Sequence, residues 1–228
     1  MQKVIAIDGP SGSGKSTMAK NLAKELNILY IDTGAMYRAL AYFASLKDIP
    51  FQEGESLTRY LNDLTIEYGN EDALIRLDGE DLSQKIREHQ VSALASQFSQ
   101  LPSVRKFLIG FQRDLGQKTI CVMEGRDIST VVFPEAFCKI FVTASAEVRA
   151  KRRLSQLVET GKDEGISFEQ VLKDVEERDR LDIEREVSPL KVAEDAVVVD
   201  TSDLSPADVL KRLIEISQEK AKGHNLSL

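Results

Sequence analysis

The sequence predicts an α/β fold with a five-stranded parallel sheet covered by helices. Short apolar segments alternate with longer amphipathic segments along most of the chain, which is the pattern of buried parallel strands and the helices that cover them. The composition agrees, because 228 residues with 42% hydrophobic and 29% charged residues are ordinary for a globular protein with a sizeable core. We therefore expect a single domain over residues 1–228.

Each expected strand is a short apolar run. In such a sheet the binding crevice lies at the carboxyl ends of the strands, so polar residues that directly follow a strand are candidates for a functional site. The five strands are expected at residues 3–7, 28–31, 119–124, 139–143 and 196–199.

Several helix boundaries are visible as capping residues. Ser167 opens a capping box, and Ser205 is an N-cap that places Pro206 at the first helical position. A further helix begins near Pro102, and Gly116 is expected to end it, because glycine commonly follows the last turn of a helix.

The alternation of strands and helices is interrupted between residues 62 and 100. Two short strands are expected there, each next to a turn sequence. We interpret this region as a subdomain inserted into the core. The strands are residues 64–68 and 73–77, and the turns are Gly69-Asn70 and Asp78-Gly79.

Charge and residue usage argue against several functions. A formal net charge of −7 disfavours a broad nucleic-acid surface, which needs clustered cations. Cys121 and Cys138 follow no metal-ligand spacing and are expected to be buried thiols, and neither His89 nor His224 has a catalytic partner nearby in sequence. No apolar leader or run of roughly 18 apolar residues is present, so we expect a cytoplasmic protein.

A phosphate-binding loop follows the first strand. The segment matches G-x-x-x-x-G-K-[ST] and precedes a helix expected over residues 16–26. Its glycines let successive backbone N–H groups point at phosphate oxygens, and the helix N-terminus adds its positive end. We expect Lys15 to reach the β- and γ-phosphates and the Ser16 hydroxyl to bind Mg²⁺. The loop residues are Gly9, Pro10, Ser11, Gly12, Ser13, Gly14, Lys15, Ser16 and Thr17.

This loop predicts a P-loop NTPase fold that binds ATP or GTP. A glycine-rich turn without a ligand would leave Lys15 unexplained. The loop alone leaves a kinase, a GTPase switch and a mechanical ATPase open. A switch GTPase is expected to carry an N-K-x-D guanine motif, and the sequence has none.

Charged residues that follow the second and third strands are candidates for an acceptor site. Arg38 lies one turn into a helix and is suited to clamp a phosphate, although a solvated helix arginine has the same appearance. Arg126 and Asp127 end the third strand, next to the phosphate loop. Arg126 is suited to phosphate, and Asp127 to a base or to a water on Mg²⁺. An ion pair between these two is the alternative.

Two further charged groups lie on helices. Arg178, Asp182 and Arg185 share one helix face, where a salt-bridge ladder would look the same. Arg149, Arg152 and Arg153 follow the fourth strand, where a mobile lid would bring cations over the transferring phosphate.

Taken together, these segments resemble the bacterial cytidylate kinases of the nucleoside monophosphate kinase group. The resemblance covers nearly the whole chain, with Thr33 where many relatives have serine and Leu181 where some have arginine. The segments that carry it are 7–12, 32–38 and 125–134, supported by 177–179 and 188–190.

The resemblance implies a direct transfer of the γ-phosphoryl group from MgATP to CMP or dCMP. The mixed charge of the surface helices favours a monomer, and the net charge of −7 argues against nucleic-acid binding. Another small-molecule P-loop kinase and a nucleotide-dependent switch are the alternatives. The implied parts are a core, residues 1–35 and 117–228, a nucleotide-acceptor subdomain with a small β insert, about 36–116, and a lid, about 152–166.

The resemblance also assigns roles to individual residues. Ser96 and Arg105 would donate to the O2 and N3 atoms of cytosine, and Asp127 would accept from its amine, a pattern that UMP does not match. The implied substrate-binding residues are Thr33, Arg38, Ser96, Arg105, Arg126, Asp127, Arg178, Asp182 and Arg185. The implied catalytic residues are Lys15, Arg126, Asp127, Arg153 and Arg178.

Overall fold

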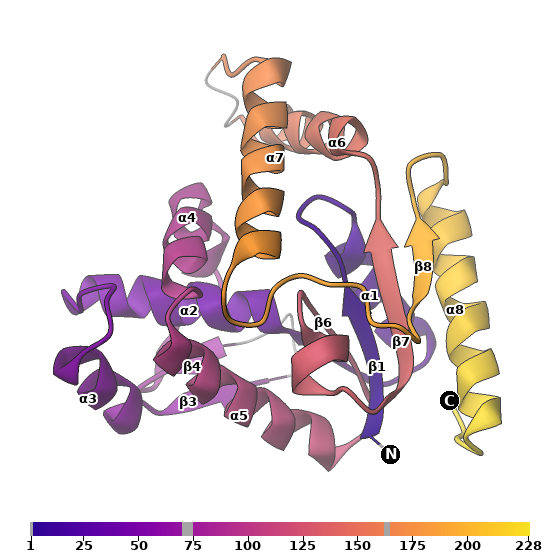
Figure 1. Ribbon diagram of the computed structural model, residues 1–228, viewed down its shortest axis with the longest axis horizontal. Coiled ribbons are helices and arrows are strands. Elements are labelled where there is room, and N and C mark those ends of the chain that lie inside the picture. The colour runs from indigo at the N-terminus through magenta and orange to yellow at the C-terminus, as the bar shows by residue number, and fades with distance from the viewer. Residues whose placement is uncertain (1, 70–74, 162–164) are drawn as a thin grey trace.

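The structure is a computed structural model that describes residues 2–69, 75–161 and 165–228. Its centre is a five-stranded sheet in the order β2-β6-β1-β7-β8, and every neighbouring pair is parallel (Figure 1). The predicted fold class is therefore confirmed. The strands are β1 (Gln2–Asp8), β2 (Leu29–Asp32), β6 (Cys121–Gly125), β7 (Ala136–Thr143) and β8 (Val197–Asp200).

Helices cover both faces of this sheet because successive strand residues point to opposite sides. In β1, Val4 and Ala6 belong to a core shared with α2, α4 and α5, whereas Ile5 and Ile7 pack with α1 and α8. All four side chains are fully buried. These helices are α1 (Lys15–Glu25), α2 (Thr33–Leu46), α4 (His89–Phe98), α5 (Pro102–Lys118) and α8 (Pro206–Gly223).

The insert contains a separate three-stranded antiparallel sheet, β3 (Ile66–Tyr68), β4 (Ile75–Leu77) and β5 (Glu80–Asp81). The turn predicted at Asp78-Gly79 is present, and both residues have positive φ, as a tight hairpin turn requires. Strand β5 was not expected. The predicted residues 70, 73 and 74 lie outside the described part of the chain. Helix α3 (Glu55–Asp63) precedes this sheet.

The helix caps agree with the sequence in two places and differ in one. Ser167 accepts a hydrogen bond from the Gln170 backbone, and Ser205 does so from the Asp208 backbone. The prediction that Gly116 ends its helix is wrong, since α5 continues to Lys118. A Cβ on Gly116 would lie 2.5 Å from the Phe133 ring, so this glycine is required by close packing.

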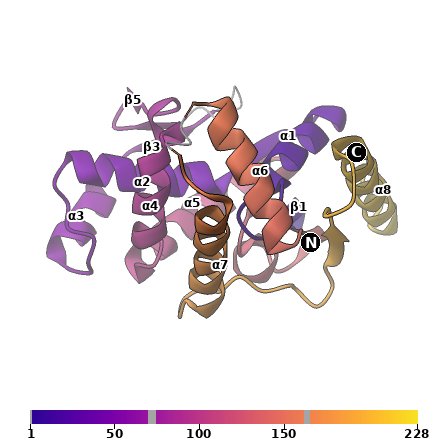
Figure 2. The same ribbon diagram turned by 90° about the horizontal axis from the view of Figure 1, so that it is seen from above.

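Helices α6 (Ala146–Glu159) and α7 (Phe168–Glu184) pack against each other beyond the carboxyl end of β7. They share a small hydrophobic core of their own, made by Ala150, Leu157, Val171 and Val175. The views in Figures 1 and 2 both place α7 between α4 and α6. Residues 162–164 of the predicted lid lie outside the described part of the chain.

The two cysteines lie in strands β6 and β7 of the central sheet. Cys121 and Cys138 are both free and buried, as expected. In the ranges that the structure describes, no helix has the length and apolar character needed to cross a bilayer.

Candidate active site

The phosphate loop joins β1 to α1 at the carboxyl edge of the sheet. Gly14 is the N-cap of α1 in the left-handed conformation, with φ of +85°. Lys15 is only 6% exposed, and its ammonium group donates to the Pro10 carbonyl at 3.2 Å. Burial, with a further contribution from Arg126, lowers the pKa of Lys15 to about 8. The carboxylates of Glu124, Asp182 and Asp32 oppose this shift, but none of them forms a direct ion pair with Lys15 within the described residues. A phosphate would give the ammonium group a direct anionic partner.

Two carboxylates lie beside this loop. Glu124 is the penultimate residue of β6, is 3% exposed, and accepts a hydrogen bond from the Tyr30 hydroxyl at 3.2 Å. Burial, and then the neighbouring Asp32, raise the pKa of Glu124. Hydroxyl and carboxylate oxygens are the donors that Mg²⁺ prefers, and Mg²⁺ usually takes few protein ligands together with substrate phosphates. Ser16, Glu124 and Asp32 therefore fit the metal of a nucleotide complex.

The start of α2 holds two of the predicted acceptor residues. The Asp32 carboxylate caps the helix by accepting from the Ala35 backbone at 2.8 Å, and it pairs with Arg38 at 3.0 Å. The Thr33 hydroxyl donates to the Glu124 carbonyl at 2.7 Å, which fastens α2 to β6. Arg38 is thus held at the edge of the sheet by a carboxylate and is not a freely solvated helix arginine.

Arg105 and Asp127 form a buried ion pair of 2.6 Å, with side chains that are 2% and 6% exposed. The Arg105 guanidinium also donates to the Ser99 carbonyl at 3.1 Å and lies 5.3 Å from the centre of the Tyr37 ring. The alternative of an ion pair between Arg126 and Asp127 does not occur. Arg126 instead pairs with Asp182 at 2.8 Å.

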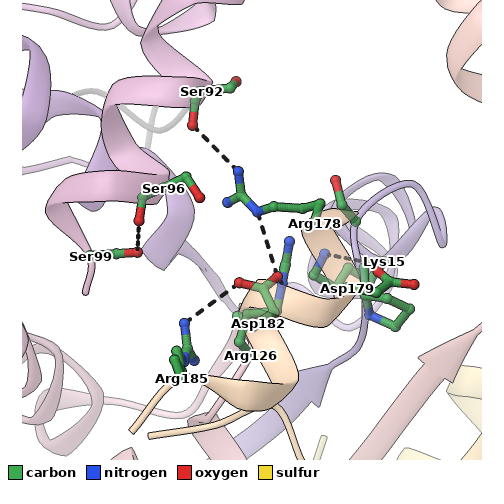
Figure 3. Close-up of polar contacts among 12 residues, drawn as sticks. Lys15, Ser92, Ser96, Ser99, Arg126, Arg178, Asp179, Asp182 and Arg185 are labelled. Atoms are coloured by element: carbon green, nitrogen blue, oxygen red, sulfur yellow. Dashed lines mark hydrogen bonds and ion pairs between the residues drawn. The ribbon is translucent and has the colours of Figure 1, made fainter. Parts of the chain in front are cut away.

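Asp182 is the centre of an arginine cluster (Figure 3). Arg126 lies 2.8 Å from its carboxylate, and Arg178 and Arg185 each lie 3.7 Å away. Burial opposes ionisation of Asp182, but the surrounding arginines hold its pKa below the usual value. Burial lowers the pKa of Arg178 and of Arg185. Arg178 and Asp182 on α7, with Arg185 directly after the helix, are therefore part of a partly buried network and not an exposed ladder.

These groups face a single cavity. Within the described residues, Tyr37 Oη, Arg178 Nε and one terminal nitrogen of Arg185 are buried there without a hydrogen-bond partner. The Arg178 Nε contacts Asp182 only as an ion pair at 3.7 Å. Buried polar groups are normally hydrogen-bonded, so donors of this kind indicate a ligand site. The cavity is lined by Ser11, Gly12, Lys15, Ser16, Asp32, Thr33, Gly34, Tyr37, Arg38, Ser92, Ala95, Ser99, Arg105, Glu124, Gly125, Arg126, Asp127, Arg178, Asp182 and Arg185.

Of the predicted substrate-binding and catalytic residues, Ser96 and Arg153 do not line the cavity, and neither do the loop residues Gly9, Pro10, Ser13, Gly14 and Thr17. The Ser96 carbonyl accepts from the Ser99 hydroxyl, and Ser92 and Ser99 line the cavity in its place (Figure 3). Arg153 donates to Gln156 on its own helix at 3.0 Å. Both assignments stay predictions for the substrate-bound protein.

Sequence reasoning missed several lining residues. Ser92 and Ser99 are seven positions apart, and this spacing places them on one helix face. Tyr37 carries no signal beyond its position next to Arg38, and Glu124 is visible in the sequence only as the polar last residue of an expected strand.

A lysine-bearing phosphate loop that faces an arginine-lined cavity across one sheet edge defines a P-loop phosphotransferase. The sequence model of the cytidylate kinase family matches residues 5–219. Because this match spans nearly the whole chain, the chain belongs to the cytidylate kinase family.

Curated relatives agree with this assignment. The chain is 44% identical to a cytidylate kinase from Thermodesulfovibrio yellowstonii over 97% of its own length and 100% of the relative. It is 46% identical to a cytidylate kinase from Carboxydothermus hydrogenoformans over 95% of this chain and 97% of that one. The predicted family is confirmed.

Proposed function

We propose that the protein transfers the γ-phosphoryl group of ATP to CMP or dCMP and forms CDP or dCDP and ADP. The observation that carries this proposal is the shared cavity, in which the phosphate loop faces buried donors on Tyr37, Arg178 and Arg185 that lack a hydrogen-bond partner. A donor phosphate and an acceptor phosphate would meet between these two walls. Cytidylate kinase relatives of matching length support the choice of acceptor.

On the donor side, backbone N–H groups of the loop and the Lys15 ammonium would hold the β- and γ-phosphates. The Ser16 hydroxyl would bind Mg²⁺, while Glu124 and Asp32 would accept hydrogen bonds from its water ligands. When bound, the metal would neutralise negative charge on the phosphates.

On the acceptor side, an oxygen of the CMP phosphate attacks the γ-phosphorus as the bond to the β-phosphate oxygen breaks, and ADP leaves. A phosphate oxygen already carries negative charge, so this step requires no general base from the protein. Arg38, Arg126 and Arg178 would position the CMP phosphate and offset the charge that develops on transfer. To do so they must turn from Asp32 and Asp182 toward the substrate.

Cytosine selection would rest on the Arg105 and Asp127 pair. Arg105 would donate to the acceptor atoms of the ring, and Asp127 would accept from the exocyclic amine. UMP presents a ring N–H and a carbonyl at those positions, and each mismatched buried group costs about 1 to 3 kcal/mol.

The setting of the enzyme is part of the same proposal. A net charge of −7 and mixed-charge surface helices support a monomer that acts in the cytoplasm on small nucleotides and does not bind nucleic acid.

The direct test measures ADP formation from MgATP with CMP, dCMP, UMP, AMP, GMP and shikimate, with Lys15→Ala as the blank. We expect strong turnover with CMP and dCMP only. Turnover with a different acceptor would keep the donor site and overturn the cytosine assignment. ADP formation with none of them would favour a nucleotide-dependent switch.

A further inference from the structure

Two arginines of α6 hold the carbonyl groups of the phosphate loop from outside the cavity. The Arg149 guanidinium donates to the Ser11 carbonyl at 3.1 Å. The Arg152 guanidinium lies 3.5 Å from the Ser13 carbonyl, which also accepts from the Thr201 hydroxyl at 3.3 Å. Alternate peptide groups of the loop are therefore bound on their carbonyl side.

Binding a carbonyl fixes the N–H group of the same peptide. A trans peptide is planar, and its C=O and N–H bonds point in opposite directions. A Ser11 carbonyl held toward α6 aims the Gly12 N–H away from α6, and a Ser13 carbonyl held there does the same for the Gly14 N–H. An anion cradle needs N–H groups that converge on one point. The α6 arginines thus set the orientation on which phosphate binding depends.

Arg149 is itself held rigidly. It is 4% exposed, and in addition to Ser11 its guanidinium donates to the Ala144 carbonyl at 2.9 Å and to both carboxylate oxygens of Asp179 at 3.0 and 2.5 Å. Gly12 has φ of +76°, and a Cβ there would lie 3.2 Å from the Arg149 Cβ. The loop therefore packs directly on this arginine.

Asp179 connects this arrangement to the acceptor side. It lies on α7 between Arg178 and Asp182, which line the acceptor part of the cavity. Arg149 and Asp179 themselves do not line that cavity.

We propose that Arg149 and Asp179 are positioning residues for the reaction: Asp179 orients Arg149, and Arg149 presets the phosphate loop for the triphosphate of the donor. This inference rests on the proposed function for its catalytic consequence, but its central claim concerns donor binding alone. It differs from the expectation that the α6 arginines act as lid cations over the transferring phosphate, because the Arg149 guanidinium is bound beneath the loop.

The test compares Asp179→Asn with Glu184→Gln, an exposed carboxylate on the same helix that pairs with Arg180. Binding of a non-hydrolysable ATP analogue is measured by calorimetry without acceptor, and KM values for ATP and CMP are measured separately. We expect Asp179→Asn to weaken analogue binding and to raise KM for ATP by about tenfold. KM for CMP should change by less than about threefold, and Glu184→Gln should match the wild type.

A double-mutant cycle separates positioning from a general loss of structure. If Asp179 acts through Arg149, then Arg149→Met combined with Asp179→Asn binds the analogue no more weakly than Arg149→Met alone. Additive losses would overturn the proposal. So would an Asp179→Asn protein that melts at a lower temperature but binds the analogue like the wild type. A wild type that binds the analogue but does not phosphorylate CMP would refute the proposed function and leave this test intact.

Discussion

The donor and acceptor walls of the cavity are built in different ways. In the proposed function the donor wall is one contiguous segment, residues 9–17, whose backbone N–H groups would bind the phosphates. The acceptor wall consists of side chains from several separate segments, and its arginines are paired with carboxylates. A main-chain cradle would need no change of partner when it binds phosphate, whereas the arginines of the acceptor wall would have to exchange one anionic partner for another. Substitutions on the two walls should therefore differ in their effects on kinetic constants and on stability.

The largest effect is expected at Lys15, which is the charged side chain of the phosphate loop on the donor wall. Lys15→Met should reduce turnover by about a thousandfold, because no other group replaces its charge on the phosphates. The same change should stabilise the ligand-free protein, since it removes a buried cation. Steady-state kinetics and thermal unfolding at pH 7 would check both results. A protein that loses activity and also melts at a lower temperature would contradict this account.

The sign of the stability effect follows from the pKa of about 8 for Lys15. The unfolded chain has a lysine pKa of about 10.4, so between these values the unfolded state binds more protons than the folded state. The Lys15 contribution to stability therefore rises with pH in this window. The gap in melting temperature between Lys15→Met and the wild type should narrow from pH 7 to pH 10.

The second effect concerns Asp127 on the acceptor wall. Asp127→Asn should lower kcat/KM for CMP by tenfold to a hundredfold, because the amide offers a weaker acceptor to the exocyclic amine and leaves Arg105 without a charged partner. Removing one member of a buried pair also destabilises the fold by about 3 kcal/mol. Binding of an ATP analogue should be unchanged. Equal losses of kcat/KM for CMP and UMP would show that Asp127 does not select the base.

Replacing Arg38 should affect only the binding of the acceptor phosphate. Arg38→Ala is expected to raise KM for CMP by about tenfold through the loss of a charge-assisted hydrogen bond. Its effect on the melting temperature should be small, since the side chain is 29% exposed and its ion pair with Asp32 is partly solvated. Kinetics at varied CMP and saturating ATP would measure it. An increase confined to KM for ATP would place Arg38 on the donor side.

The smallest effect distinguishes Ser96 from its neighbours on α4. Ser92 and Ser99 line the cavity and Ser96 does not. If substrate does not rearrange α4, Ser96→Ala should change the ratio of CMP to UMP turnover by less than about twofold, and Ser99→Ala should change it more. A large change for Ser96→Ala alone would mean that α4 turns when CMP binds.

The contrast between the two walls also explains what the sequence could predict. The five core strands and the phosphate loop follow from local patterns, and each was found to within a few residues. The ion pair of Asp127 with Arg105 does not follow from local patterns, because the two residues are 22 positions apart and meet only through the packing of α5 on the sheet. The role of Gly116 was misjudged for the same reason, since its need for space comes from Phe133 in a later segment.

The position of β1 at the middle of the sheet has a consequence for biosynthesis. Its two hydrogen-bonding neighbours are β6 and β7, which lie more than a hundred residues later in the chain. The ribosome synthesises the strand residues from Lys3 to Ile7 long before the neighbouring strands β6 and β7. Non-local pairing of this kind is slow to form and leaves a strand exposed to aggregation in the interval. Chaperone protection of the nascent chain should therefore matter most until β7 has emerged.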